Sequence, residues 1–316
     1  MENNVINTVN KAAQPTKQPF RLTMRRREAL FGYLFLTPWI VGFLFLTLGP
    51  MLASIYLSLT NYKMIAAPVF IGTANYERMF TDQLMWQALK VTSIYTLFSV
   101  PLNLISAMAV AVLLNQKIVA SGIFRTVFYL PSVISGVAVA LVFAWIFNYR
   151  FGILNYFISL VGIEGPNWLG SPRYALSALV VMSLWGIGGN VVIYLAGLQS
   201  VPVSLHEAAT IDGAGAWTRF WSITLPLVTP VILFTMVMGV IGTFQTFTQA
   251  YIMTAGGPAN ATLFYLLYLY KNAFNWFEMG YASSLAWLLT IIILILTAIL
   301  WTTSARWVYY EGEVRK

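Results

Sequence analysis

The sequence predicts an all-α membrane protein with six transmembrane helices, and three observations support this fold class. Only 18 Lys/Arg and 10 Asp/Glu occur in 316 residues, so 9% of the chain is charged, whereas soluble domains carry about 25% charged residues. Hydrophobic residues make up 59% of the chain. The charges are also clustered, which leaves six long charge-free intervals. A soluble fold could not bury so much apolar surface, so most of the chain is predicted to lie in lipid.

Each charge-free interval has room for the roughly 20 apolar residues that cross a bilayer core. The predicted spans cover residues 30–58, 91–115, 126–148, 174–199, 225–253 and 280–304. Together they form one transmembrane domain over residues 30–308, between an N-terminal tail (1–29) and a C-terminal tail (309–316). The segment Met1–Phe20 is polar and aperiodic, which predicts disorder.

Two intervals need a further argument. The first span is too long for the hydrophobic region of a signal peptide and no small-residue cleavage site follows it, which predicts an uncleaved helix. Pro38 and Pro50 are expected to kink or end this helix. The fifth interval is long enough for two spans, but Gly256-Gly257-Pro258 interrupts it. The apolar segment Leu263–Tyr270 after the interruption is too short to cross a bilayer.

The distribution of basic residues predicts the orientation. With the N-terminus inside, the cytoplasmic segments hold 12 Lys/Arg and the outer loops hold 6. Arg25, Arg26 and Arg27 contribute much of this difference. The positive-inside rule then places both termini in the cytoplasm. The formal net charge of +8 is attributed to this anchoring and not to a nucleic-acid partner.

Several classes of chemistry are absent from the sequence. There is no cysteine, and His206 is the only histidine, so neither a thiolate site nor a histidine cluster can form. No ionisable residue lies in the middle of a predicted span, which argues against a proton-driven carrier and a strongly anionic substrate. The chain also has no G-x-x-x-x-G-K-[ST] sequence, the P-loop that binds ATP. If the chain transports a solute, the energy is expected to come from another subunit.

The cytoplasmic loop over residues 202–226 has the pattern of a capped short helix. Ser204 and Glu207 have the spacing of a capping box, and Glu207 is expected to lie favourably at the positive end of the helix dipole. Ala208 and Ala209 are strong helix formers and leave a low surface against which another backbone could pack. A capped turn between two spans occurs in many polytopic proteins, so this part of the pattern alone does not decide the function.

The complete spacing of the loop is more specific. Gly213 is expected to end the helix in a left-handed conformation, and Leu225-Pro226 to begin the next span. The order is Glu-Ala-Ala, three residues, Gly, nine residues, Ile, one residue, Leu-Pro. It resembles the EAA motif of the permeases of binding-protein-dependent ABC importers, in which this loop docks on the ATPase subunit. The resemblance assigns that contact to Glu207, Ala208, Ala209, Asp212, Gly213, Leu225 and Pro226.

Other segments resemble the carbohydrate branch of the same family, in the order found in maltose-type permeases. They are Phe124–Pro131, Gly152–Asn155, Asn167–Leu169, Gly256–Pro258 and Gly280–Ser283. The resemblance covers roughly residues 30–308. The outer loop Asn61–Leu89 is short, so the large periplasmic domain and two additional N-terminal helices of the maltose permease are missing.

The resemblance implies a type I ABC importer permease: a transport subunit, not an enzyme, that forms half of the path for a sugar or oligosaccharide. It implies no cofactor in this chain, with ATP and Mg on the partner ATPase. The implied partners are a second homologous permease, two copies of the ATP-binding subunit and an extracytoplasmic solute-binding protein. The implied location is the cytoplasmic membrane of a bacterium or archaeon.

Span five carries a polar and small-residue stripe. Its members recur at gaps of 4, 3, 4 and 3: Thr235, Gly239, Gly242, Thr246 and Gln249. Such a stripe is typical of close helix packing, but it could also line a substrate path, as the resemblance implies. The candidate path residues are Thr243, Phe244, Gln245, Thr246 and Phe247, with Ser183, Trp185 and Asn190 in span four. Gly186, Gly188 and Gly189 each weaken span four by about 1 kcal/mol relative to alanine, so an unwound segment is expected there.

Other functional classes remain as alternatives. A stand-alone secondary carrier or channel for a small neutral solute would have inverted repeats and an embedded charge or an ion-coordinating broken helix. A membrane enzyme would need clustered acids, bases or metal ligands at one depth, and none are found. An amino-acid or peptide permease of the same superfamily would also carry the loop motif.

Overall fold

The structure is a computed structural model that describes residues 23–116 and 121–309. It is mostly helical, as predicted, and consists of two units, residues 1–54 and 55–316. Most of both predicted tails, including the segment Met1–Phe20, lies outside the described residues.

The first unit is a long apolar helix. It comprises α1 (Met24–Gly42), a π-helical turn (Phe43–Leu48) and the start of α2 (Gly49–Ser58). No residue of α1 or of the π-helical turn is buried. Pro38 and Pro50 were expected to kink or end this helix. Both lie inside the helical segment, so neither ends it. Pro50 lacks the N–H that would close an α-helical turn, and the π-helical turn before it widens the backbone to accommodate this loss.

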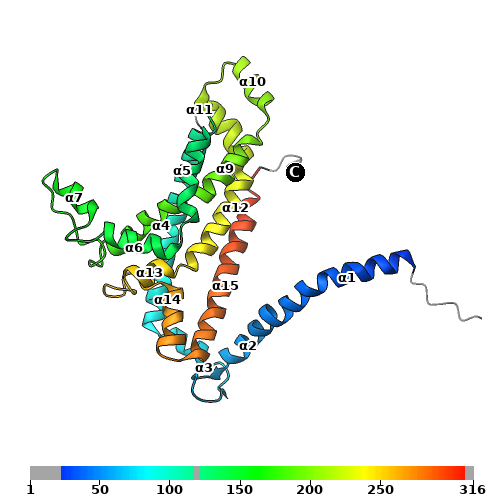
Figure 1. The fold of residues 1–316 in the computed structure, drawn as a ribbon, viewed down its shortest axis with the longest axis vertical. Helices are drawn as coiled ribbons and strands as arrows, with labels where there is room; N and C mark the ends of the chain where they lie inside the picture. The colour runs from blue at the N-terminus through cyan, green and yellow to red at the C-terminus, as the bar shows by residue number, and fades with distance from the viewer. Residues whose placement is uncertain (1–22, 117–120, 310–316) are drawn as a thin grey trace, which may run out of the picture. The chain divides into compact units, whose positions relative to one another are not determined.

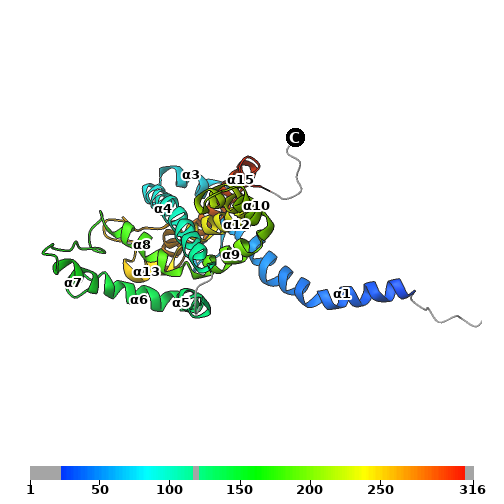
Figure 2. The ribbon, with the colours of Figure 1, turned by 90° about the horizontal axis from the view of Figure 1, so that it is seen from above.

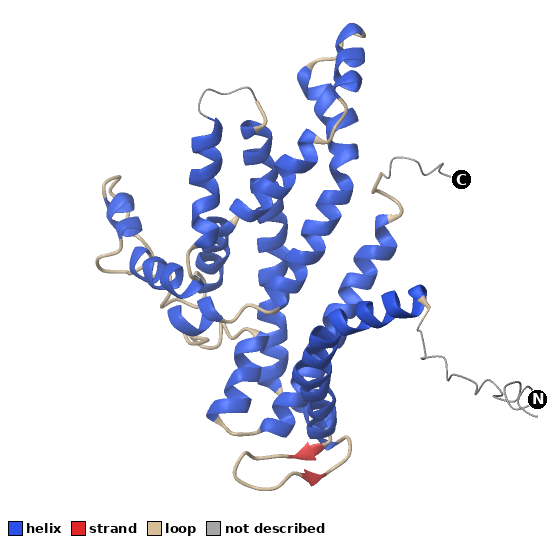
Figure 3. Cartoon of the chain, turned by 45° about the vertical axis from the view of Figure 1, so that its right-hand side comes forward, coloured by secondary structure: helices blue, strands red, loops and turns tan. Residues whose placement is uncertain are grey.

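The second unit begins with a small antiparallel pair of strands, β1 (Thr60–Asn61) and β2 (Val69–Phe70), with Thr60 opposite Phe70. Its helices in chain order are α3 (Ala74–Thr81), α4 (Gln83–Leu114), α5 (Ser121–Val133), α6 (Gly136–Ile146), α7 (Ile153–Ser159), α8 (Ala175–Ser183), α9 (Gly188–Gln199), α10 (Val203–Ile211), α11 (Ala216–Arg219), α12 (Leu225–Phe244), α13 (Thr248–Met253), α14 (Tyr265–Tyr270) and α15 (Met279–Ser304). The helix α10 lies at one end of this unit, and α3 and the strands lie at the other (Figures 1 and 3).

The helix α4 is the centre of the second unit and packs against α8, α9, α12 and α14. Small residues allow these approaches. Ala107 and Ala111 of α4 are fully buried, and a Cβ atom on Gly239 of α12 would lie 3.4 Å from Val100. One buried core surrounds Tyr95 and a second surrounds Ala107. Seen from above, α5, α6 and α7 run along one side of the bundle (Figure 2).

The predicted number of spans agrees with the structure when bent helix pairs are counted as single spans. Within residues 23–116 and 121–309, four helical segments are long and apolar enough to cross a membrane on their own, and two pairs qualify only together. The pair α5 and α6 is bent by 96°, and the pair formed by α8 and α9 is bent by 50°. The second bend contains a 3₁₀ turn at Leu184–Gly186, close to the glycines for which an unwound segment was predicted.

The predicted span over residues 225–253 lies within the helical segment Ala216–Met253, which is long and apolar enough to cross a membrane, but this segment starts earlier than predicted and is not one regular helix. Helical backbone begins at Ala216 and passes through a π-helical turn (Phe220–Thr224) before α12. At the other end α12 stops at Phe244, and α13 starts at Thr248. The stripe that includes Gln249 therefore does not lie on one continuous helix. The second span also starts earlier than predicted, because the Asp82 side chain caps α4 at Gln83.

Candidate coupling helix and substrate path

The predicted loop helix is present as α10, but its start differs from the prediction. The capping position is taken by Pro202 (φ −59°, ψ 125°), and no side chain caps the helix. The carbonyl of Pro202 accepts the N–H of Leu205 at 3.2 Å, so helical backbone begins one residue before Ser204. Ser204 then lies inside the first turn and Glu207 in the second. The predicted capping box is therefore wrong, as is the argument that Glu207 meets the helix dipole in the first turn.

The end of α10 follows the prediction. Gly213 has φ +77°, the left-handed conformation that glycine adopts without strain. The N–H of Gly213 donates to the carbonyl of Thr210 at 3.1 Å, and the N–H of Ala214 donates to that of Ala209 at 2.8 Å. This pair of hydrogen bonds is a Schellman motif, which satisfies the last carbonyls of a helix.

The surface of α10 is available to another chain. None of its nine residues is buried. Glu207, Ala208, Asp212 and Gly213 are exposed, and Ala209 is half-buried. Ile211 is 87% exposed, so the end of the helix presents an apolar side chain beside the carboxylates.

The remaining predicted coupling residues lie inside the chain. Leu225 and Pro226 are half-buried in the first turn of α12. Between them and α10 is a contact that the sequence analysis missed: the guanidinium of Arg219 donates to the hydroxyl of Thr210. The Thr210 hydroxyl in turn donates to the carbonyl of His206 at 2.7 Å. Arg219 thus connects α10 to the helix that continues into α12.

The candidate path residues do not form a single group. Ser183 and Thr243 contact the polar residues of α4, because Asn103 donates to the Ser183 hydroxyl at 2.8 Å and Thr96 donates to that of Thr243 at 3.0 Å. The hydroxyl of Tyr95 lies beside Ser183 and Thr246. These groups join three helices through polar contacts. The α4 residues were not predicted, although Tyr95, Ser99 and Asn103 recur at helical spacing.

The other candidate path residues make none of these polar contacts. Phe244 is 3% exposed and belongs to the core, so the structure makes this ring a packing residue. Gln245 is exposed and Asn190 is half-buried. Trp185 is 47% exposed, and its ring meets the edge of Phe143 at 5.7 Å between centroids.

Phe247 belongs to an aromatic cluster between α13, α14 and the π-helical turn Lys271–Asn275 that follows α14. Its ring stacks on Tyr251 with centroids 5.2 Å apart, and it lies 4.9 Å from the ring of Tyr270. Tyr270 in turn contacts Phe274 at 5.0 Å. We call Phe247, Tyr251, Tyr270 and Phe274 the aromatic cluster.

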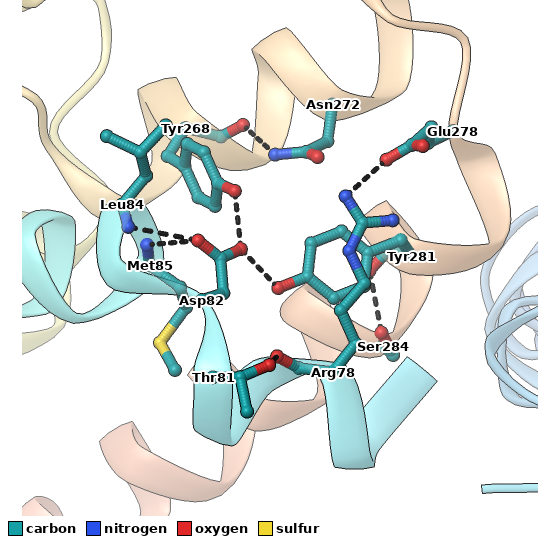
Figure 4. A network of polar contacts seen from close by, with 10 residues as sticks. All are labelled: Arg78, Thr81, Asp82, Leu84, Met85, Tyr268, Asn272, Glu278, Tyr281 and Ser284. Carbon is teal, nitrogen blue, oxygen red and sulfur yellow. Dashed lines mark hydrogen bonds and ion pairs between the residues drawn. The ribbon is translucent and has the colours of Figure 1, made fainter. Parts of the chain in front are cut away.

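A polar network at the end opposite α10 was also missed (Figure 4). One oxygen of Asp82 accepts the N–H groups of Leu84 and Met85, at 3.0 and 3.1 Å. The other oxygen accepts the hydroxyls of Tyr268 and Tyr281, each at 2.5 Å. Burial disfavours the Asp82 carboxylate, but these hydrogen bonds outweigh it and lower the pKa of Asp82. The network therefore holds an ionised carboxylate among α4, α14 and α15.

An ion pair accompanies this network. Arg78 of α3 contacts Glu278 at 2.8 Å, and its guanidinium lies 4.0 Å from the centroid of the Tyr281 ring. Burial lowers the pKa of Arg78, but the contact with Glu278 outweighs it and raises that pKa. The network and the ion pair thus join α3 and α4 to α14 and α15, two pairs of elements that are far apart in the sequence.

Comparison with known proteins identifies the family. Residues 99–309 match the family described as "Binding-protein-dependent transport system inner membrane component". The chain is 47% identical over 293 residues to a probable ABC transporter permease protein, YesP, of Bacillus subtilis (strain 168), covering 91% of this chain and 94% of YesP. It is 36% identical to the lactose transport system permease protein LacF of Rhizobium radiobacter, covering 88% of this chain and 95% of LacF.

A third relative and a solved structure agree with this assignment. The chain is 31% identical to the trehalose/maltose transport system permease protein MalF of Thermococcus litoralis, covering 87% of this chain and 94% of that protein. Its fold matches a chain in the crystal structure of a bacterial alginate ABC transporter in complex with an alginate-bound periplasmic protein, with a TM-score of 0.79 and 21% identity, over 89% of this chain and 96% of that chain. The chain therefore belongs to the family of inner-membrane permease components of binding-protein-dependent ABC importers.

Proposed function

We propose that this chain is one of two permease subunits in an ABC importer for a sugar or oligosaccharide. The observation that carries the proposal is the exposed helix α10 with the EAA spacing, at one end of a permease fold. The carbohydrate assignment is supported by relatives named for lactose and for trehalose and maltose transport. An extracytoplasmic binding protein delivers the substrate in this proposal.

The coupling contact is assigned to Glu207, Ala208, Ala209, Asp212 and Gly213 on and after α10. These residues bind a cytoplasmic ATPase subunit, which is present in two copies and holds ATP and Mg. Nucleotide binding shifts the inward–outward equilibrium only through contacts that differ between the two states. Moving such an equilibrium from 1:99 to 99:1 takes about 5.5 kcal/mol. Leu225 and Pro226, half-buried in α12, receive this change rather than contact the ATPase.

The second permease subunit is supported by the exposed apolar helices. Within the second unit, Val137, Leu141 and Trp145 of α6 are 49%, 58% and 56% exposed, and an apolar helix needs lipid or another helix around it. A homologous subunit completes the path and covers part of this surface. The path itself is assigned to Gln245, Thr246 and Phe247 where α12 ends, together with Ser183, Trp185, Asn190 and Thr243.

The location follows from the same reasoning. Several helices are long and apolar enough to span a membrane, so the chain is a multi-pass protein. We place it in the cytoplasmic membrane of a bacterium or archaeon, with both termini and α10 inside. The end with α3 then faces outward, toward the binding protein.

The test is co-purification followed by transport. The tagged chain is extracted in mild detergent, and the associated chains are identified by mass spectrometry. We expect a P-loop ATPase and a second six-span permease, and ATP-dependent sugar uptake after reconstitution with the binding protein. Recovery as a homo-oligomer, with uptake that does not require ATP, would instead support a secondary carrier. The purified chain alone is expected to bind no ATP.

A further inference from the structure

A single lysine adjoins the aromatic cluster in the sequence. Lys271 is the only Lys or Arg between Arg219 and Arg306, and it directly follows Tyr270 of the cluster. Two of the four rings face outward, because Tyr251 is 45% and Phe274 49% exposed. Packing within this chain therefore does not account for the whole cluster.

The ammonium of Lys271 makes fewer hydrogen bonds within the chain than it has donors. It donates one hydrogen bond, to the carbonyl of Ala255 at 2.7 Å, although an ammonium group has three donors. Among residues 23–116 and 121–309, the one side-chain ion pair joins Arg78 and Glu278, so Lys271 has no carboxylate partner there. Burial lowers the pKa of Lys271. The structure thus holds a half-buried cation with donors to spare.

The adjoining loop is shaped around this ammonium. Gly256 has φ +92°, and a Cβ atom there would lie 3.3 Å from the Lys271 nitrogen. The loop is held by side chains. The Thr262 hydroxyl donates to the carbonyl of Gly257 at 2.6 Å, and it lies 2.7 Å from the hydroxyl of Thr254. Ala255, whose carbonyl accepts the hydrogen bond from Lys271, also has a positive φ of 50°. The loop therefore presents a fixed carbonyl to Lys271.

We propose that Lys271 and the aromatic cluster form a contact site for an acidic saccharide, with the sugar ring on the aromatic faces and its carboxylate or sulfonate on the ammonium. Aromatic faces carry negative charge and attract the polarised C–H groups of a sugar, and a lysine ammonium is a point charge suited to an anion. The site continues the proposed path, because α13 follows Phe247 directly. The inference deepens the proposed function and rests on it.

This site also changes one expectation from the sequence. A strongly anionic substrate was disfavoured because no cation lies within a predicted span. Lys271 lies outside the spans, between α14 and α15, yet it directly follows Tyr270, whose ring lies 4.9 Å from that of Phe247. A cation can thus reach the candidate path from a connecting segment.

The first test is chemical footprinting of the assembled importer. The acylation rate of Lys271 is measured by mass spectrometry with added oligogalacturonate and with the neutral oligogalactose of equal length, and Lys63 on the outer loop serves as an internal control. We expect saturating oligogalacturonate to slow acylation of Lys271 about ten-fold, with Lys63 unchanged and no effect of the neutral saccharide. Equal acylation of Lys271 with both saccharides would overturn the site.

The second test is uptake by reconstituted importers. Lys271→Gln is expected to lower uptake of the acidic saccharide by about ten-fold or more, as for loss of a charged hydrogen bond, and to leave neutral uptake unchanged. Lys271→Arg should retain most acidic uptake, and Lys63→Gln should behave as wild type. Equal loss of both substrates in Lys271→Gln would make the lysine structural and overturn the site. Absence of ATP-dependent uptake of every saccharide by the wild type would count against the proposed function, while footprinting would still decide the site.

Discussion

Arg219 and Thr210 connect the exposed helix α10 to the helical segment that leads into the membrane. The guanidinium of Arg219 donates to the Thr210 hydroxyl. Thr210 belongs to the last turn of α10, and Arg219 ends α11. From Arg219 the backbone remains helical through the π-helical turn into α12. A force on α10 therefore reaches α12 through a side-chain contact as well as through the loop.

Breaking this contact should weaken coupling. In Arg219→Ala, α10 loses its attachment to α11, so ATP hydrolysis is expected to continue with several-fold less sugar transported per ATP. The measurement is the ratio of sugar uptake to phosphate release in proteoliposomes. Thr210→Val removes the acceptor and should have the same effect. An unchanged ratio in both variants would show that the contact has no role in coupling.

Gly213 offers a sharper test of the helix end. Alanine at φ +77° is strained by roughly 1–2 kcal/mol, so Gly213→Ala should loosen the Schellman motif and reduce ATPase binding and uptake. Gly215→Ala is the matched control, because a Cβ there meets no atom within 4 Å and its φ is −68°. Equal uptake in the two variants would contradict the role of the turn. Glu207→Ala, on the exposed face, is expected to reduce coupling without changing the amount of membrane-inserted chain.

Variants at the end of α12 can distinguish residues that contact the substrate from residues that pack in the core. Replacing Gln245 and Thr246 by alanine should lower uptake about three- to ten-fold for each hydrogen bond lost to the sugar, with ATPase subunits still co-purifying. Phe244→Ala should instead destabilise the core by about 3–5 kcal/mol and lower the yield of folded chain. The measurements are uptake and thermal unfolding of each variant. Normal uptake in the double variant would leave these two residues with a packing role only.

The glycines of span four differ in the space around them. A Cβ on Gly188 would lie 2.2 Å from the carbonyl oxygen of Phe128, whereas one on Gly189 meets no atom within 4 Å. Gly188→Ala should therefore push α5 from α9 and destabilise the fold by about 1–3 kcal/mol. Gly189→Ala should unfold at the wild-type temperature or above. Similar unfolding temperatures for the two variants would mean that α5 moves aside without loss.

The Asp82 network predicts that the stability of the protein depends on pH in the acidic range. The pKa of Asp82 falls below its ordinary value of 3.8, so the folded state favours the ionised carboxylate. This stabilisation is fully present above the unfolded pKa and is lost as the pH falls through the lowered folded pKa. The difference in unfolding temperature between wild type and Asp82→Asn should stay constant from neutral pH to about pH 5 and then narrow. A constant difference down to pH 3 would mean that the charge of Asp82 contributes nothing.

The sequence predicted the helical membrane fold, and its local signals in the coupling loop were partly right. Gly213 was assigned correctly because its role depends only on the backbone of its own turn. The capping box was wrong because Pro202 supplies the start of α10 in its place. Ser204 and Glu207 have the spacing of a capping box, but spacing does not determine at which residue the helix begins.

Contacts between distant residues could not be predicted from one sequence. Asp82 meets Tyr268 and Tyr281, which are 186 and 199 residues away, and no local pattern relates them. The polar residues of α4 were predictable in principle, since Tyr95, Ser99 and Asn103 have helical spacing like that used for span five. The end of α12 was missed because the sequence remains free of charged residues through the break at Gln245, and no Gly or Pro marks that break.

The Asp82 network also has a consequence for the order in which the chain is assembled. A ribosome makes α4 long before α14 and α15. The Asp82 carboxylate therefore lacks the hydrogen bonds from Tyr268 and Tyr281 while three further spans enter the bilayer. The end of α4 next to Asp82 is thus completed only when synthesis is nearly finished. A nascent chain that stops before Tyr281 would lack one of the two hydroxyls that bind the Asp82 carboxylate, so this end of the bundle reaches its final stability only with the last span.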